Sequence, residues 1–78
     1  MATKSVPSLS TIEQMLYEVE EYSRAVEALR RRLKRHKLGS PSYHDLLPEL
    51  AVQLDVLKVK TEHAGQALEE YEESLPEE

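Results

Sequence analysis

Apolar residues recur in the first half of the chain at alternating steps of three and four. The positions are Ile12, Met15, Val19, Tyr22, Val26, Leu29 and Leu33. This alternation is the spacing of a coiled-coil seam. Ser10, with Glu13 three residues later, has the pattern of a capping box. The pattern predicts a helix over residues 10–37, which Gly39 would cap and which Pro41 would prevent from continuing.

A second stripe with the same alternation follows. Its positions are Tyr43, Leu47, Leu50, Leu54, Leu57, Thr61, Ala64, Leu68, Tyr71 and Leu75. We predict a second helix over about residues 42–74. Its start is open to two interpretations. Ser42 with Asp45 three residues on is one N-terminal cap, and Asp45 itself is the other, which would place Pro48 in the first turn.

The two stripes mirror each other about Gly39 and Ser40. In an antiparallel pair of helices, facing residues have a nearly constant sum of numbers. Leu33 with Leu47 gives 33 + 47 = 80, and Tyr22 with Leu57 gives 22 + 57 = 79. The sequence therefore predicts an all-α fold, an antiparallel two-helix hairpin (a helix-turn-helix coiled coil). Its turn is expected at about residues 38–42, with Gly65 on the inner face.

The predicted hairpin, residues 10–74, leaves two terminal segments. We expect a flexible N-terminus over residues 1–9 and a flexible acidic tail over residues 75–78. Residues 1–10 contain no apolar segment of the kind found in a signal peptide. The chain has no Cys, which suits a reducing compartment, so we expect a cytoplasmic protein.

Composition narrows the function classes. A chain of 78 residues forms one small domain, and domains near this size are marginally stable alone. The absence of Cys excludes a disulfide scaffold, and no apolar run is long enough to cross a membrane. His36, His44 and Asp45 near the turn lack the spacing of known metal ligands. We expect no enzyme activity, no catalytic residue, no cofactor and no metal.

The net charge of −5 is unevenly distributed along the chain. Two cations and five acids give residues 1–29 a charge of 2 − 5 = −3, and residues 30–44 carry +6. Two cations and ten acids give residues 45–78 a charge of 2 − 10 = −8. The basic run Arg30–Lys37 is a candidate nucleic-acid site. Against it, its cations point around the helix, no aromatic residues interleave with them, and the rest of the chain is acidic. We therefore expect a solvated helix end.

A third apolar feature lies away from the predicted seam. Val52, Val56 and Val59 follow helical spacing, roughly 140–200° around the second helix from Leu54. Because two helices alone bury little, we predict that these valines form a partner-binding surface. The alternative is incidental surface valines. Leu9, Leu16 and Leu46 flank the two seams and would widen the apolar surface.

Residues 23–68 resemble a known family. The residues that carry the resemblance are the stretch Ser23–Lys34 (SRAVEALRRRLK), a Gly-containing turn, Tyr43, a leucine-bearing helix, and the small residues Ala64, Gly65 and Ala67. This pattern is similar to the small YscE-like co-chaperones of bacterial type III secretion needle subunits.

The resemblance implies a helical hairpin that pairs in the cytoplasm with a helical-repeat, tetratricopeptide-like chaperone. That pair would keep a needle subunit from polymerising before export, a role in protein transport and virulence. The family has no catalytic motif. Independently of this resemblance, the alternative is a self-associating four-helix-bundle adaptor, a weak homodimer of two hairpins, that serves as a structural module or binds nucleic acid through Arg30–Lys37.

Overall fold

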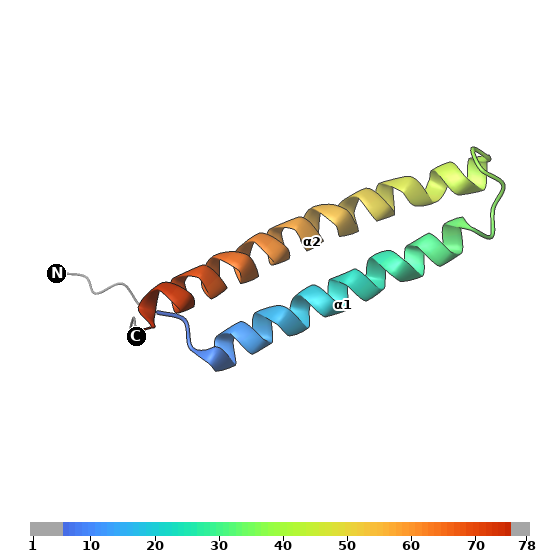
Figure 1. Ribbon diagram of the computed structural model, residues 1–78. Coiled ribbons are helices and arrows are strands. Elements are labelled where there is room, and N and C mark those ends of the chain that lie inside the picture. The colour runs from blue at the N-terminus through green and yellow to red at the C-terminus, as the bar shows by residue number, and fades with distance from the viewer. Residues whose placement is uncertain (1–5, 76–78) are drawn as a thin grey trace.

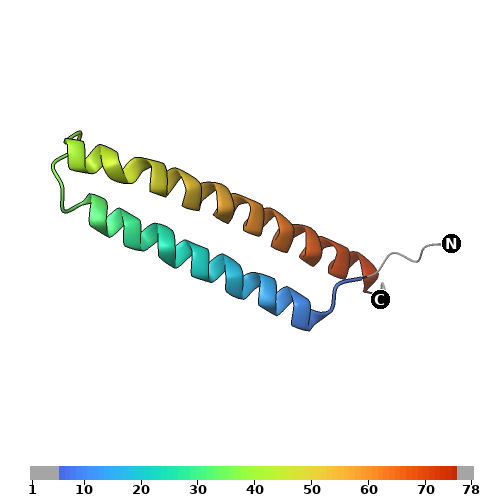
Figure 2. The same ribbon diagram turned by 180° about the vertical axis from the view of Figure 1, so that it is seen from behind.

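The computed structural model describes residues 6–75 and consists of two helices, α1 (Leu9–Leu33) and α2 (Pro41–Ser74). The helices run antiparallel and lie side by side along the length of α1, and the longer α2 extends beyond it (Figures 1 and 2). The predicted all-α helical hairpin is therefore confirmed. The outer parts of the two segments predicted to be flexible, residues 1–5 and 76–78, lie outside the described residues.

The hairpin is a rod rather than a sphere. Its principal dimensions are 57 × 24 × 18 Å, and its radius of gyration is 17.8 Å. A compact domain of this length would have a radius of gyration of about 11.5 Å. An elongated pair of helices exposes much of the surface that a globular domain would bury.

The N-cap of helix α1 lies two residues before the predicted cap, and the helix itself begins at Leu9. Ser8 is the N-cap, with an extended backbone (φ −77°, ψ 160°), and its Oγ accepts a hydrogen bond from the Thr11 backbone N–H at 3.1 Å. An N-cap must have a non-helical backbone, and Ser10 is already helical. The capping box predicted at Ser10 and Glu13 is therefore wrong.

Helix α1 also ends earlier than predicted, at Leu33 rather than at residue 37. Beyond it, the backbone N–H groups of Arg35 and His36 donate to carbonyls three residues back, those of Arg32 and Leu33, both at 3.1 Å. Bonds of this span tighten the last turn and satisfy carbonyl groups that a helix end leaves free. The second half of the basic run thus belongs to the loop.

The sharpest point of the loop is at Gly39. Its φ of +78° is a backbone conformation that glycine adopts without steric penalty. It lies in a turn closed by a 2.9 Å hydrogen bond from the Ser40 N–H to the Lys37 carbonyl. Gly39 is therefore a turn residue directly before α2, and the prediction that it caps α1 is wrong.

Helix α2 begins at Pro41, one residue before the predicted start at about 42, but neither N-cap considered from the sequence, Ser42 or Asp45, is right. Ser40 is the N-cap, and its Oγ accepts from the Tyr43 N–H at 3.2 Å. Pro41 occupies the first helical position, where its fixed φ and missing N–H fit. It starts α2, whereas we expected it to stop α1. Pro48 lies inside the helix, which continues without a break to Ser74, where the predicted helix ends.

The core is thin. Six apolar side chains are buried between the helices, namely Ile12, Leu29, Leu33, Leu46, Ala64 and Ala67. Two of the six are alanines, and no large side chain in residues 6–75 is completely buried. The three core residues of α1 belong to the predicted stripe. We infer that packing between the two helices stabilises the hairpin less than a full core stabilises a globular domain of the same length.

The contact face of α2 is turned relative to the predicted seam. Leu54, placed in the seam, is 46% exposed, and Leu47 is 37% exposed. Their neighbours, buried Leu46 and half-buried Gln53, lie at the contact instead. Adjacent residues are 100° apart around a helix. Contact through residues 46 and 53 instead of 47 and 54 therefore means that α2 is rotated about its own axis relative to the prediction.

Cross-helix ion pairs mark the side to which α2 is turned. Lys60 Nζ lies 3.3 Å from Glu18 Oε2, and Arg32 Nη1 lies 3.6 Å from Glu49 Oε2. The residue numbers sum to 18 + 60 = 78 and 32 + 49 = 81, on either side of the predicted 79–80. The predicted register along the helices therefore holds, and only the rotation of α2 differs. Gly65, expected on the inner face, is exposed, and a Cβ added there would meet nothing within 4 Å.

Candidate interaction surfaces

The three valines predicted to bind a partner form the first surface, here called the valine strip (Val52, Val56 and Val59). Val52 is 58% exposed and Val59 is 46% exposed, whereas Val56 is half-buried. Val56 lies closer to α1 than the sequence predicted, because the contact face of α2 has turned toward it. Two of the three valines remain uncovered by the hairpin.

A shallow hollow of about 210 Å³ adjoins the valine strip. Its lining includes Ala25 and Ala28 of α1 and Glu49 and Gln53 of α2. Residues three apart are neighbours on a helix surface, so Glu49 and Gln53 lie next to Val52 and Val56. The small alanine side chains leave the hollow open at the groove between the helices.

Gln53, one of the residues that line the hollow, carries an unsatisfied polar atom. Gln53 Oε1 is buried and has no hydrogen-bond partner among the described residues. An unpaired buried acceptor destabilises a fold by about 1–3 kcal/mol. The valine side of the hairpin thus combines exposed apolar groups, a recess and an acceptor that lacks a donor.

The second surface was not predicted as such. It is the leucine band, defined as Leu9 and Leu16 of α1 with Leu47 and Leu54 of α2, all of which are exposed. At 100° per residue, Leu54 lies roughly 120–140° around α2 from the ion-pairing residues Glu49 and Lys60. The α2 leucines therefore lie on the flank opposite the ion pairs.

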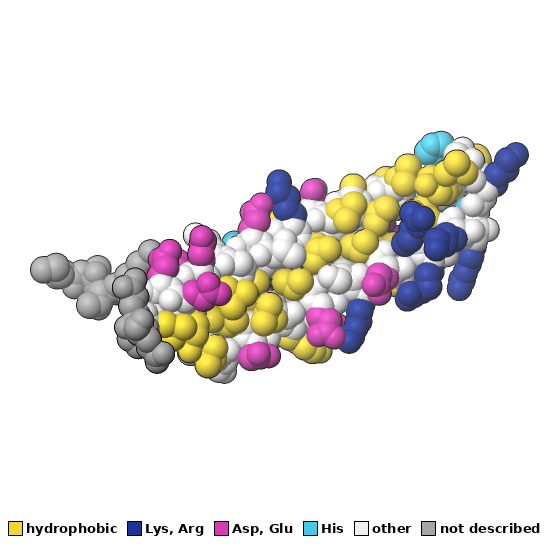
Figure 3. Space-filling model, in the orientation of Figure 1, with side chains coloured by type: hydrophobic (Ala, Val, Ile, Leu, Met, Phe, Trp, Pro, Cys, Tyr) yellow, Lys and Arg dark blue, Asp and Glu magenta, His cyan; other side chains and the backbone are white. Residues whose placement is uncertain are grey.

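The α1 leucines lie on the same flank of the hairpin. Leu16 lies roughly 160° around α1 from both Glu18 and Arg32, which make the cross-helix ion pairs. The band therefore lies on one face of the hairpin, on α1 near the open end and on α2 near the loop. Figure 3 shows hydrophobic side chains gathered in an oblique band along the groove between the helices.

The leucine band was not predicted from the sequence, because Leu47 and Leu54 were assigned to the contact between the helices. This assignment was ambiguous at Leu46 and Leu47. Two adjacent leucines allow two seams, one through residue 46 and the other through residue 47. The second is the more apolar, since it passes through Leu54 rather than Gln53 and through Thr61 rather than Lys60. Leu46, expected only to flank the seam, is in the core. The adjacent leucines were the one available signal of this rotation.

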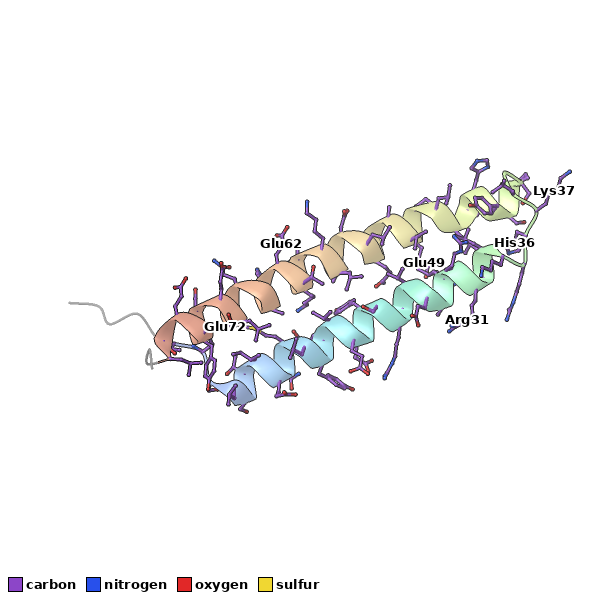
Figure 4. The ribbon with its side chains drawn as sticks, in the orientation of Figure 1. Arg31, His36, Lys37, Glu49, Glu62 and Glu72 are labelled. Carbon is purple, nitrogen blue, oxygen red and sulfur yellow. The ribbon has the colours of Figure 1, made fainter. Side chains whose placement is uncertain are left out.

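The basic run forms the third surface. All of its Lys and Arg side chains are exposed and gather at the loop end, while acidic side chains lie along the rest of the rod (Figure 3). Arg31 lies on the side of α1 away from α2, and Lys37 points outward from the loop (Figure 4). The cations therefore spread around the end of the rod rather than forming one flat face.

Metal-binding groups and membrane-spanning segments were sought in the part of the chain that the structure describes. Within residues 6–75, no group of three or more His, Cys, Asp or Glu side chains is arranged to hold a metal ion. The ring of His44 packs edge-on against Tyr43, with centroids 6.2 Å apart. Over the same residues, neither helix has an apolar stretch long enough to span a membrane.

Comparisons with protein-family models, with curated proteins and with solved structures found no match to this chain.

Proposed function

We propose that this chain is a non-enzymatic interaction module that binds a helical-repeat partner through the valine strip. The observation that carries the proposal is the exposure of Val52 and Val59 on the side of α2 where Val52 adjoins the alanine-lined hollow. β-branched residues have no advantage on an exposed helix surface, and removing a valine from water contributes about 1.5–3 kcal/mol. A partner helix could place a side chain in the hollow and cover both valines.

The thin core supports a function that depends on a partner. A protein that binds only the folded hairpin stabilises it by mass action. Helical-repeat proteins in turn need their terminal repeats covered by a polar outer face, which the charged outer side of the hairpin would supply. Each protein would thereby complete the other.

The narrower proposal follows from the resemblance of residues 23–68 to the YscE-like family. We propose a co-chaperone that binds and stabilises a tetratricopeptide-like chaperone in the cytoplasm. Together they would keep a type III secretion needle subunit from polymerising. The hairpin fold and the uncovered valine strip support this role, since a short hairpin can cover the end of a repeat chaperone.

Co-expression with a tetratricopeptide-like needle chaperone, encoded beside a type III secretion system in the same genome, tests the proposal. We expect a stable stoichiometric complex on size-exclusion chromatography. Val59→Asp should weaken it roughly tenfold or more, because an unpaired carboxylate would be buried at the contact. Val56 is a poorer probe because it is half-buried in the hairpin itself, so that a charge there would also affect folding.

Leu54→Asp is the matched control, because Leu54 and Val59 are equally exposed, at 46%, on different sides of α2. It should leave the complex intact. Circular dichroism of both variants checks that helicity is unchanged. A complex that tolerates Val59→Asp while Leu54→Asp disrupts it would show that the valine strip is not the contact.

The needle-subunit role has its own readout. With the chaperone and the hairpin both present, the needle subunit should stay in the supernatant on ultracentrifugation. With the chaperone alone, the chaperone should lose stability and the needle subunit should pellet. Equal protection with and without the hairpin would argue against the co-chaperone assignment while leaving the interaction surface to be tested separately.

A further inference from the structure

We propose that the leucine band binds a second copy of this chain, lying antiparallel, so that the loop end of each copy covers the open end of the other. The dimer is a four-helix bundle of two crossed hairpins. It uses the face opposite the cross-helix ion pairs. This self-association is therefore separate from the binding of a different protein through the valine strip.

The band is complementary to itself. Leu9 and Leu16 have the same separation as Leu47 and Leu54, about 10.5 Å along a helix axis. The first pair lies toward the open end and the second in the half nearer the loop. A two-fold axis through the middle of the band therefore sets Leu9 against the partner's Leu47, and Leu16 against the partner's Leu54. Such an interface is isologous, with each pair occurring twice.

The oblique course of the band fixes how the hairpins meet. Because it passes from α1 to α2 along the rod, two copies that share it must cross at an angle rather than lie parallel. Helices in four-helix bundles cross at about 20°, which is the kind of small angle that this arrangement requires. Gly65 projects on the same side of α2 as Leu47, five full helical turns further on, and the space above it is open. The missing side chain allows close approach.

Charge selects the antiparallel orientation. Residues 30–44 carry +6 and form the loop end, and the segments on either side carry −3 and −8. Parallel copies would bring two basic loops together, whereas antiparallel copies bring each basic loop to the partner's acidic end. Lys34 and Glu72 lie five full turns beyond Leu16 and Leu54, so both project on the face of the band. In the antiparallel dimer, Lys34 of one copy therefore lies at the same end of the interface as Glu72 of the other copy.

The hairpin has enough surface to form this interface. α2 has 34 residues and is about 51 Å long, and two helices side by side are about 20 Å wide, so one long face of the hairpin has a projected area of roughly 1,000 Å². A standard interface buries about 800 Å² on each partner. A dimer through the leucine band leaves Val52 and Val59 accessible, so self-association and heterologous binding use separate faces.

Sedimentation equilibrium of the full chain, from micromolar to millimolar concentration, tests the dimer. We expect a reversible monomer–dimer equilibrium that weakens as salt is added, because unlike charges flank the interface. Leu54→Glu should raise the dimer dissociation constant roughly tenfold or more. The matched variant Val59→Glu, equally exposed in the hairpin, should leave it unchanged.

A chain that stays monomeric over this range would overturn the proposal. A dimer that responds to Val59→Glu and not to Leu54→Glu would overturn it as well. Leu16→Glu is the second probe of the band, for use if circular dichroism shows that Leu54→Glu has lost helicity. Because these measurements use the chain alone, they are independent of whether the needle chaperone binds.

Cross-linking tests the orientation, which the absence of native Cys makes simple. In an equal mixture of Leu9→Cys and Leu47→Cys chains, the antiparallel dimer should give mainly mixed disulfides under mild oxidation. Leu47→Cys alone should form few disulfides, because its partner's position 47 lies at the other end of the interface. Efficient disulfide formation by Leu47→Cys alone would show parallel copies and contradict the proposal.

Discussion

Lys60 Nζ lies 3.3 Å from Glu18 Oε2 across the hairpin and 5.9 Å from the centroid of the Tyr22 ring. A lysine thus occupies a contact position of α2 that the sequence assigned to Thr61. Its side chain is only 32% exposed, as expected for an aliphatic stem that lies against the hairpin while the ammonium reaches Glu18. Lys60 thus shows that α2 is rotated relative to the predicted seam, and it also makes one of the two cross-helix ion pairs.

Lys60→Ala should lower the free energy of unfolding by about 1 kcal/mol, through lost stem packing and loss of the cation–π contact. Glu18→Gln should have a smaller effect, because both side chains of the ion pair are partly exposed. Urea denaturation of the two single variants and the double variant gives the coupling energy, expected below about 1 kcal/mol. A coupling several times larger would show a desolvated ion pair, contrary to this geometry.

Leu46→Ala and Leu47→Ala form a matched pair that tests the rotation of α2. Leu46 is buried and Leu47 is 37% exposed. Leu46→Ala should lower the free energy of unfolding by about 2–3 kcal/mol, and Leu47→Ala by less than about 1 kcal/mol. The measurement is chemical denaturation at low protein concentration, where the chain is monomeric. The reverse order would restore the seam through Leu47.

Ser40→Ala should destabilise the hairpin by about 1 kcal/mol, because it removes the side-chain acceptor for the Tyr43 N–H at the start of α2. Ser42→Ala is the control, since Ser42 is exposed and already helical. Its effect should stay within about 0.5 kcal/mol. Thermal unfolding followed by circular dichroism compares the two, and a larger loss for Ser42→Ala would move the cap to Ser42.

The two glycines should respond to alanine with opposite signs. Gly39→Ala should destabilise the chain by about 1 kcal/mol, because its φ of +78° disfavours a Cβ. Gly65→Ala should stabilise α2 by about 0.5–1 kcal/mol, because the helical position has free space for the methyl group. Urea denaturation of each variant measures both shifts. Destabilisation by Gly65→Ala would indicate that α1 approaches Gly65 after all.

The sequence by itself determined the two helices, their antiparallel pairing and their register. Apolar spacing of three and four leaves few alternatives to helices, and a single turn signal at Gly39 fixes how the stripes must face. The caps were harder to predict, because several serines lie near each helix start and the extended backbone of Ser8 and Ser40, which capping requires, cannot be read from residue type.

Only the tertiary structure decided which side of α2 faces α1. Adjacent Leu46 and Leu47 allow two rotations, and the composition of α2 alone favours the seam through Leu47, which is not the one that contacts α1. The choice depends on contacts with the other helix, namely the ion pairs of Lys60 and Glu49 and the fit of Leu46 into the core. That rotation leaves Leu47 and Leu54 exposed and half-buries Val56. It thereby defines both surfaces proposed for binding.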